Sequence, residues 1–200
     1  AELVGGDTIE ADELILSGTA VGLTEKPILR SSANPEEVVG VTGDLGSASL
    51  GAWILEKDAD FNPNSSAVKK AIEPAPRTDE ALILRDYVSS MTDISDSLAV
   101  SLFDISGMSE VGFEIHVDEL PISDDSKDTA VDLETDAIEH ALYGGGDYEL
   151  LFTASEENFE RIKRRLDVTS IGATTKEVKI TGIKDGSRFE IKRKGYEHFR

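Results

Sequence analysis

Three short segments combine glycine or hydroxyl residues with aspartate, and these segments are the ones best suited to chemistry. They are residues 5–8 (Gly-Gly-Asp-Thr), 92–96 (Thr-Asp-Ile-Ser-Asp) and 144–147 (Gly-Gly-Gly-Asp). Glycine lets backbone N–H groups approach a phosphate closely, and carboxylates beside it can hold a hard cation such as Mg²⁺. Together the segments indicate a metal–phosphate site. Taken singly, each also fits a structural role, as a turn, a helix cap or a helix C-terminus.

Several other kinds of active site are excluded by what the sequence lacks. It has no Cys, which removes disulfides, thiolate catalysis and Cys-ligated zinc. Its three His residues, His116, His140 and His198, include no pair four residues apart, as zinc proteases require. Neither a G-x-S-x-G elbow nor a G-x-x-x-x-G-K-[ST] loop occurs, so the sequence favours neither a serine hydrolase nor a common P-loop enzyme.

The size and charge of the chain indicate a globular protein that does not bind nucleic acid. It has 200 residues, of which 39% are hydrophobic and 30% charged, enough for a sizeable core. Its formal net charge of −20 would repel nucleic-acid phosphate. No stretch approaches the ~18 consecutive apolar residues of a membrane span, so we expect no membrane partner. Because there is no Cys, a reducing compartment, the cytoplasm, fits best.

The charge is divided unevenly along the chain. Residues 161–200 carry +7, whereas residues 1–160 carry −27. A basic C-terminal segment that folds back onto an acidic body lowers its self-repulsion, or it faces an anionic ligand. A solvated, salt-tolerant surface is the alternative for most of these charges.

The hydrophobic pattern predicts the elements that must hold the three segments. Strands are expected at residues 38–42, 111–117, 148–153, 168–171, 178–183 and 189–192, with an Asp-Gly turn at 184–186. Helices are expected after the glycines at 43–46, before the prolines at 74 and 76, from residue 78, after residue 96, over 129–142 and after residue 155. Among their residues, Trp53 is expected in the core and Leu82 on a buried face, while Asp93 and Asp96 are expected at a helix N-terminus.

Residues 14–23 form a further apolar run near the start of the sequence. They read as a buried strand with two closely packed glycines. Nothing before them supplies neighbouring strands, so we expect a first sheet that is truncated or completed by a partner.

Five motifs, in order along the chain, resemble those of the thiamine-monophosphate kinases. They are residues 5–8; Leu-Arg-Ser-Ser-Ala at 29–33 with Val-Thr-Gly at 41–43; Met-Thr-Asp-Ile-Ser-Asp at 91–96; Gly-Gly-Gly-Asp-Tyr-Glu-Leu-Leu-Phe at 144–152; and Gly-Tyr-Glu-His-Phe at 195–199. The wider superfamily includes aminoimidazole ribonucleotide synthetase, selenophosphate synthetase and a hydrogenase-maturation protein. The likeness spans nearly the whole chain, and the third, fourth and fifth motifs in combination are typical of the thiamine kinase branch.

The resemblance implies ATP-dependent phosphorylation of thiamine monophosphate to thiamine diphosphate, by direct in-line transfer with several Mg²⁺ ions. By motif match, the Mg²⁺ ligands are Asp7, Asp93 and Asp96, of which Asp96 is taken as catalytic. The residues expected to touch ATP are Gly6, Asp7, Arg30 and Ser95. Arg30 offers a planar fork for a phosphate. Tyr196 is expected to pack on the thiamine substrate.

The sequence departs from the family pattern at three places. Ser97 stands where the family has Gly, and Gly146 stands where it has a Glu expected to contact substrate. Asp147 is the candidate substitute for that Glu in contacting substrate. The family also carries, before the position of Gly5, an N-terminal sheet domain with its own magnesium motif. We therefore expect no turnover from this chain alone.

These observations predict an α+β fold, a mixed β-sheet covered by helices, similar to the C-terminal domain of aminoimidazole ribonucleotide synthetase. Residues 1–24 are assigned to remnant strands of the N-terminal ATP- and Mg-binding domain, and residues 25–200 to the C-terminal α+β domain. The resemblance implies a homodimer for the intact protein. Two alternatives stay open: a hydrogenase-maturation or purine-synthesis paralogue, and a non-catalytic stand-alone domain that dimerises or pairs with a separate ATP-binding partner.

Overall fold

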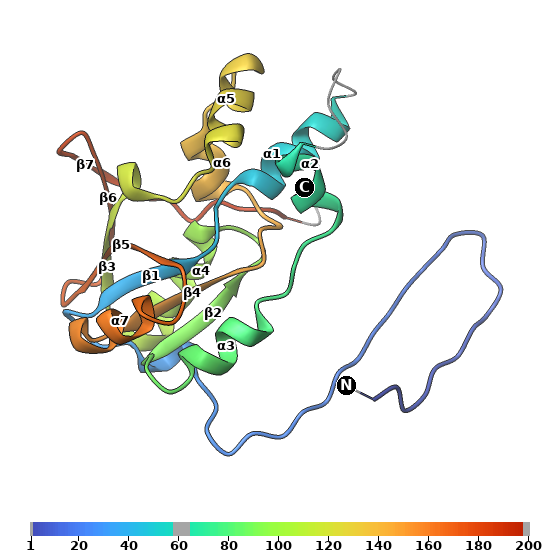
Figure 1. Cartoon of the computed structure of the whole chain (residues 1–200), viewed down its shortest axis with the longest axis horizontal. Coiled ribbons are helices and arrows are strands. Elements are labelled where there is room, and N and C mark those ends of the chain that lie inside the picture. Colours follow the sequence, from blue (N-terminus) through green and yellow to red (C-terminus); the bar gives the residue numbers. More distant parts are fainter. Residues whose placement is uncertain (1, 58–64, 198–200) are drawn as a thin grey trace.

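A seven-stranded mixed sheet organises the chain, whose computed structural model describes residues 2–57 and 65–197 (Figure 1). Its strands are β1 (Val38–Thr42), β2 (Ser90–Ile94), β3 (Gly112–His116), β4 (Glu149–Ala154), β5 (Val168–Thr175), β6 (Ile180–Lys184) and β7 (Ser187–Glu190). They lie in the order β2-β4-β1-β5-β3-β6-β7. Every neighbouring pair is antiparallel except β3 and β6, which are parallel. The predicted α+β class with a mixed sheet is therefore confirmed.

Seven α-helices accompany the sheet within the described residues. They are α1 (Ser47–Glu56), α2 (Ser66–Ile72), α3 (Thr78–Leu84), α4 (Leu98–Ser109), α5 (Asp124–Asp132), α6 (Ala137–Tyr143) and α7 (Glu156–Lys163), with two short 3₁₀ turns, η1 (Arg30–Ser32) and η2 (Val117–Glu119). Hydroxyl side chains begin several of them. Ser97 accepts the N–H of Val100, and Ser155 accepts the N–H of Asn158, as N-cap residues do.

The two faces of the sheet bury separate hydrophobic clusters, because side chains alternate along each strand. On one face, Val39 and Val41 of β1 pack in a cluster with Leu98, Leu102 and Ile105 of α4. On the other face, Phe152 of β4 packs with Phe159 and Ile162 of α7 and Leu84 of α3. A third cluster joins α1, α2 and α5 at one end of the molecule, seen at the top of Figure 1.

Most predicted elements are present, and four details are wrong. Residues 90–94 form strand β2, so Asp93 lies on a strand and not at a helix N-terminus. The helix expected over 129–142 is two helices, separated where Glu134 adopts a left-handed φ of 54°. Strand β5 continues through Gly172, which was expected to end it. Leu82 is 58% exposed, and Leu84 takes the buried position on α3 instead.

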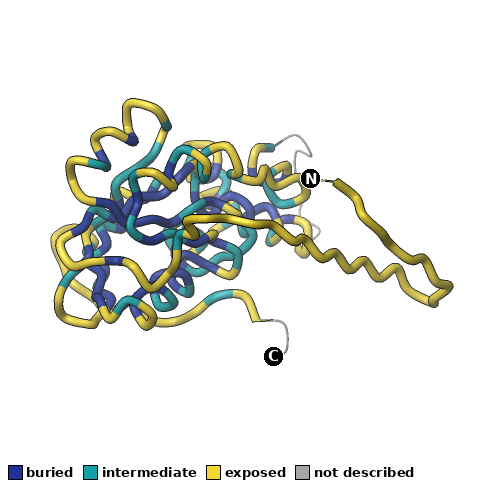
Figure 2. The backbone as a smooth tube through the Cα atoms, turned by 90° about the horizontal axis from the view of Figure 1, so that it is seen from below, coloured by how far each residue is buried: buried dark blue, intermediate teal, exposed yellow. Residues whose placement is uncertain are grey.

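The N-terminal segment, residues 2–27, contains no helix or strand and is exposed throughout (Figure 2). The strand predicted at 14–23 is therefore wrong for this chain: Leu14, Leu16 and Val21 are each more than 80% exposed. A strand needs a hydrogen-bonded neighbour, and no described segment pairs with this one. Residues 198 and 199, which end the fifth motif, lie outside the described residues. Among the helices described, none has the length and apolarity needed to cross a bilayer.

Candidate functional site

The second predicted segment forms a sharp turn between β2 and α4. Asp93 lies near the end of β2, Ser95 and Asp96 form the turn, and Ser97 caps α4. The hydroxyl of Ser101, one turn into α4, donates to the carbonyl oxygen of Asp93 at 3.1 Å. This pairing of strand and helix holds the two carboxylates of Asp93 and Asp96 at the surface, three residues apart.

The glycine segment packs directly against this turn. The N–H of Gly146 donates to the carbonyl oxygen of Ser95 at 2.7 Å, and the N–H of Tyr148 donates to that of Ile94 at 2.9 Å. A Cβ at Gly145 would lie 2.7 Å from the Ser95 carbonyl oxygen and 2.8 Å from that of Asp96. Only glycine permits so close an approach, and Gly146 also adopts a left-handed φ of 89°. The two motifs are thus joined backbone to backbone.

The C-terminal segment completes the arrangement. The N–H of Tyr196 donates to the carbonyl oxygen of Asp96 at 3.0 Å, and the hydroxyl of Ser97 donates to that of Lys194 at 2.8 Å. Ser97, where the resemblance expects Gly, therefore holds the C-terminal segment in place. Three segments, each separated from the next by more than 45 residues of sequence, meet at one turn.

A cavity of about 540 Å³ lies at this junction. Residues from all three segments line it, namely Ser95, Asp96, Gly145, Gly146, Tyr148 and Tyr196. The structure thus brings the predicted catalytic Asp96, the predicted ATP contact Ser95 and the predicted substrate contact Tyr196 into one pocket. Gly146, where the family has its substrate-contacting Glu, lines the same cavity.

Arg30 lies at the outer side of the Asp-Ile-Ser-Asp turn. Its Nε donates to the hydroxyl of Thr92 at 2.8 Å, and one terminal nitrogen lies 3.9 Å from the Asp93 carboxylate. Both the guanidinium and the carboxylate are about half exposed, so each can also reach a ligand. The predicted phosphate contact Arg30 is therefore next to one predicted metal ligand.

Asp147 is placed differently from the substrate contact expected for it. It is 2% exposed, and its carboxylate accepts the N–H groups of Gly46 at 2.7 Å and Ala48 at 3.1 Å, where α1 begins. It lines a separate cavity of about 180 Å³ rather than the 540 Å³ pocket. Burial raises the pKa of Asp147 to about 6, although Lys70, 3.8 Å away, and the two N–H groups oppose this rise.

An ion network surrounds Asp147. Arg77 makes a two-point contact with the buried Glu149, with both distances 2.7 Å, and this contact raises the pKa of Arg77 further above its usual range. Lys70 contacts Glu149 at 3.0 Å and Asp44 at 2.9 Å. Burial lowers the pKa of Lys70, but the surrounding carboxylates outweigh it and the pKa lies above its ordinary value. The network ties α2, the segment before α1 and the start of α3 to strand β4.

Gly6 and Asp7, by contrast, lie in the exposed N-terminal segment. The Asp7 carboxylate accepts the N–H of its neighbour Thr8 at 2.9 Å. No group of three carboxylate or His side chains able to hold a metal occurs among the described residues. Asp93 and Asp96 nevertheless suit Mg²⁺, which is commonly held by one or two carboxylates with substrate phosphates and water. The chain supplies two of the three predicted ligands at one place.

Helix α1 and His140 are parts of the pocket that sequence reasoning missed. Ser49, Ala52, Trp53 and Glu56 of α1 line the cavity, and so does His140 of α6. The ring of His140 lies 3.0 Å from the hydroxyl of Ser49 and 3.1 Å from that of Thr135, and burial lowers its pKa. The spacing 49, 52, 53, 56 marks one helix face, but periodicity alone does not say that the face borders a cavity.

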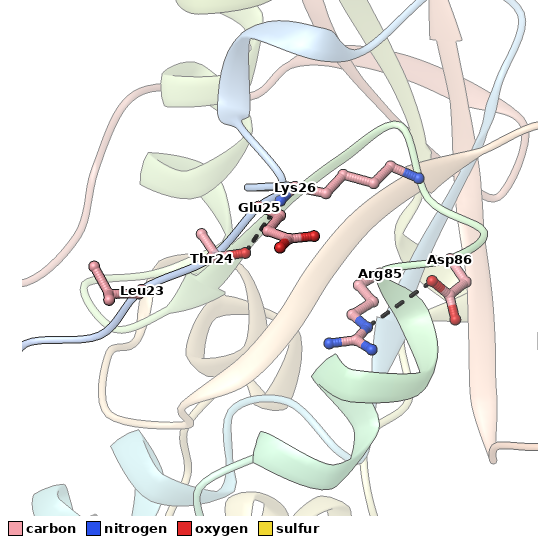
Figure 3. A pocket seen from close by; sticks show the side chains of 6 residues that line it. All are labelled: Leu23, Thr24, Glu25, Lys26, Arg85 and Asp86. Carbon is pink, nitrogen blue, oxygen red and sulfur yellow. Dashed lines mark hydrogen bonds and ion pairs between the residues drawn. The ribbon is translucent and has the colours of Figure 1, made fainter.

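Figure 3 shows another pocket, of about 330 Å³, between the N-terminal segment and the end of α3. Leu23, Thr24, Glu25 and Lys26 line one side, and Arg85 and Asp86 line the other. The charges on each side balance, with Arg85 and Asp86 3.9 Å apart. None of these residues belongs to a motif that the sequence singled out for chemistry.

The chain is similar to known proteins in both sequence and structure. No family model matches the chain. A thiamine-monophosphate kinase of Methanospirillum hungatei JF-1 is 39% identical over 201 residues, which cover 99% of this chain and 63% of the relative. A thiamine-monophosphate kinase of Bacillus subtilis is 34% identical over 216 residues, covering 100% of this chain and 65% of the relative. The chain thus spans less than two thirds of the length of these relatives.

The chain is also similar to solved structures, some at nearly 30% sequence identity and others at much lower identity. AaThiL complexed with AMPPCP and TMP matches with a TM-score of 0.78 and 29% identity, over 88% of this chain and 55% of that one. Escherichia coli HypE, a hydrogenase maturation protein, matches with a TM-score of 0.71 but 16% identity, over 86% of this chain and 54% of that one. At that identity the likeness to HypE shows a shared fold and no more.

Proposed function

Because the chain is a homologue of the thiamine-monophosphate kinases over about three fifths of their length, we propose that it forms part of an enzyme that phosphorylates thiamine monophosphate with ATP. The bond formed joins an oxygen of the acceptor phosphate to the γ-phosphorus of ATP. The bond broken joins that phosphorus to the β–γ bridging oxygen, so the products are thiamine diphosphate and ADP. The related structure that contains AMPPCP, an ATP analogue, and TMP supports both substrates.

One observation carries the proposal: three motifs far apart in sequence meet around one cavity of about 540 Å³. The cavity is lined by Ser95, Asp96, Gly145, Gly146 and Tyr196. A phosphoryl transfer asks mainly for positioning and charge neutralisation. The site offers carboxylates for metal binding beside a pocket for the organic part of an acceptor.

Each residue of the site has a separate role in the proposed transfer. Asp93 and Asp96 hold Mg²⁺, which when bound neutralises charge on the phosphates. Arg30 binds a phosphate oxygen through its exposed guanidinium. Ser95 offers a hydroxyl to the nucleotide, and Tyr196 packs its ring on the thiamine moiety. The close backbone contacts of Gly145 and Gly146 fix these groups relative to one another.

Gly6 and Asp7 belong to this proposal as ATP and metal contacts supplied from the N-terminal segment. Residues 2–24 are exposed and apolar in part, and we assign residues 1–24 to the ATP-binding region of the enzyme rather than to the fold of residues 25–200. The two contacts then reach the site when a further sheet, from the same polypeptide or from a second subunit of a homodimer, packs on this segment. The transfer activity is accordingly proposed for the native gene product that contains this chain.

Substitution of Asp96 tests the proposal in that gene product. Asp96→Ala removes a metal-binding carboxylate, so kcat for thiamine diphosphate formation should fall by about 10²–10³. Product is measured by separation of thiamine phosphates after incubation with Mg-ATP. Asp128→Ala is the matched control, because Asp128 is an exposed aspartate on α5 outside the pocket. Unchanged turnover in Asp96→Ala would remove Asp96 from the site.

The paralogue alternative is tested by a panel of acceptors. The native product is assayed with thiamine monophosphate and with the acceptors of the purine-synthesis and hydrogenase-maturation reactions. Phosphorylation of thiamine monophosphate alone supports the proposal. Turnover only of another acceptor, or of none, would assign the chain to a paralogue or to a non-catalytic role.

A further inference from the structure

Helix α1 presents two different faces to its surroundings. Leu50 and Ile54 are buried in the cluster with Ala67 and Val68 of α2. Ser49, Ala52, Trp53 and Glu56, at positions i, i+3, i+4 and i+7, line the 540 Å³ cavity. The helix is therefore anchored on one side and forms a wall of the site on the other.

The lining of the cavity favours a planar group that is neutral or positively charged. Three aromatic side chains, Trp53, Tyr148 and Tyr196, border it, and none of its described lining residues is Lys or Arg. Its carboxylates are those of Asp96 and Glu56. Aromatic ring faces attract cations, and carboxylates do so more strongly. An isolated phosphate has no cationic side chain to bind here.

Trp53 is only half-buried, because its ring packs against the α1–α2 cluster without being enclosed by it. The ammonium of Lys57 lies 6.0 Å from the centroid of this ring. The ring of Trp53 thus already attracts one positive charge at its surface. It differs in this from a tryptophan that only fills a core.

We propose that Trp53 is a specificity-determining residue that packs against the ring system of the acceptor, with Glu56 facing its positive charge. This inference rests on the proposed function, since thiamine carries a planar pyrimidine and a cationic thiazolium ring. It extends that function to residues of α1 that belong to none of the matched motifs. Trp53 and Tyr196 would then recognise the organic part of the acceptor, while Arg30 and the metal-binding carboxylates recognise phosphate.

Trp53 is the only tryptophan in the sequence, so its fluorescence reports directly on this pocket. Thiamine and thiamine monophosphate are titrated into the 200-residue chain, with inorganic phosphate as a third probe, and affinities are measured by calorimetry. We expect saturable quenching by both thiamine compounds and none by phosphate. Trp53→Leu should weaken binding of both thiamine compounds roughly 5- to 30-fold, the range of a strong cation–π contact.

Two further variants keep the test independent of folding. Trp53→Phe retains an aromatic ring and should show an intermediate loss, and Glu56→Gln, at an exposed position, should weaken binding about 2- to 5-fold at low salt and less at high salt. Leu55→Ala is the control, since Leu55 lies on α1 outside the pocket and is 40% exposed. It should bind as the wild type does.

The outcomes separate this inference from the proposed function. If Tyr196→Ala abolishes thiamine binding while Trp53→Leu and Trp53→Phe retain wild-type affinity, the role of Trp53 is overturned and the proposed function stands. If the wild-type chain binds neither thiamine compound, and its native gene product does not phosphorylate thiamine monophosphate, both fail. Quenching by inorganic phosphate at equal concentration would also overturn the assignment of Trp53 to the ring system.

Discussion

The carboxylate of Asp147 occupies a position where ionisation is costly, and this has a measurable effect on stability. Burial raises its pKa to about 6, from an ordinary value of 3.8. The folded state therefore binds a proton more tightly than the unfolded state does. The resulting stabilisation is fully present below pH 3.8 and is lost as the pH rises through about 6.

Asp147→Asn removes this titration. We expect the difference in the free energy of unfolding between wild type and variant to fall by about 2 kcal/mol between about pH 4.5 and pH 7. Urea unfolding at several pH values measures it, and subtraction of the variant cancels the other carboxylates. A difference that is flat across this range would mean that the pKa of Asp147 is not raised. His140, whose pKa burial lowers, is present in both proteins and cancels as well.

Asp147 also shows how a motif residue can serve structure instead of binding. Its two backbone hydrogen bonds, to Gly46 and Ala48, tie the glycine segment to the start of α1. Since α1 carries Trp53 and Glu56 into the cavity, Asp147 sets the position of one wall relative to another. The sequence indicates that Asp147 is part of a site, but it does not show which way the side chain points.

The contact between the glycine segment and the β2–α4 turn is testable with substitutions at two glycines. Gly145→Ala places a Cβ within 3 Å of two carbonyl oxygens, so the segment must move away from the turn. We expect a loss of about 1–3 kcal/mol in the free energy of unfolding, together with weaker thiamine binding.

Gly107→Ala is the matched control on α4. A Cβ there meets nothing within 4 Å, and Gly107 lies inside a helix, where alanine is the better residue. This variant should gain about 0.5–1 kcal/mol. Thermal and urea unfolding compare the two. Equal effects of both substitutions would contradict the close packing at Gly145.

The elements that sequence reasoning found are those whose pattern is local. Strand β1 and helix α7 follow directly from an apolar run and from a serine cap with helical spacing. Strand β2 was missed because Ser-Met-Thr-Asp-Ile has few strand-forming residues and becomes a strand by pairing with β4 over five positions. No Gly or Pro marks the break between α5 and α6 in the sequence, because Glu134 itself adopts the left-handed conformation there.

The pocket was predictable only in part, for a related reason. The ordered motifs indicate that Asp96, the glycine segment and Tyr196 belong together, and the structure places all three around one cavity. The contribution of α1 depends on which neighbour its second face meets, and that is a property of the tertiary fold. The sequence spacing therefore predicts a core position for Trp53, whereas in the structure Trp53 lines the cavity.

Over the whole molecule, the basic C-terminal segment folds back onto the acidic body. Arg188 pairs with Glu114, Arg193 with Asp104 at 2.9 Å, and Lys194 with Glu139 at 3.4 Å. The basic side chain of each pair is more than half exposed to solvent, so each pair contributes little by itself. Together they lower the self-repulsion of a chain with a net charge of −20. These contacts are the ones expected when the C-terminal segment, with its charge of +7, folds back onto the acidic body.

The N-terminal segment does not pack into the folded body of the molecule. Residues 2–27 are exposed, and Leu14, Ile15 and Leu16 stand together as adjacent apolar side chains at 77–88% exposure. Because the segment buries nothing within the chain, removal of residues 2–24 should change the free energy of unfolding by less than about 0.5 kcal/mol. The same apolar run, with unpaired backbone groups, can pair with another chain.

We therefore expect the full chain to self-associate with rising concentration and the shortened chain to stay monomeric, as measured by sedimentation. Leu14→Asn combined with Leu16→Asn keeps the length of the segment and should also reduce association, since it removes two apolar side chains from one face of the extended run. If the shortened chain associates as strongly as the full chain, the contact between copies lies on the folded body. If instead its free energy of unfolding falls by several kcal/mol, residues 2–24 pack on the fold, and their assignment to a separate ATP-binding region is wrong.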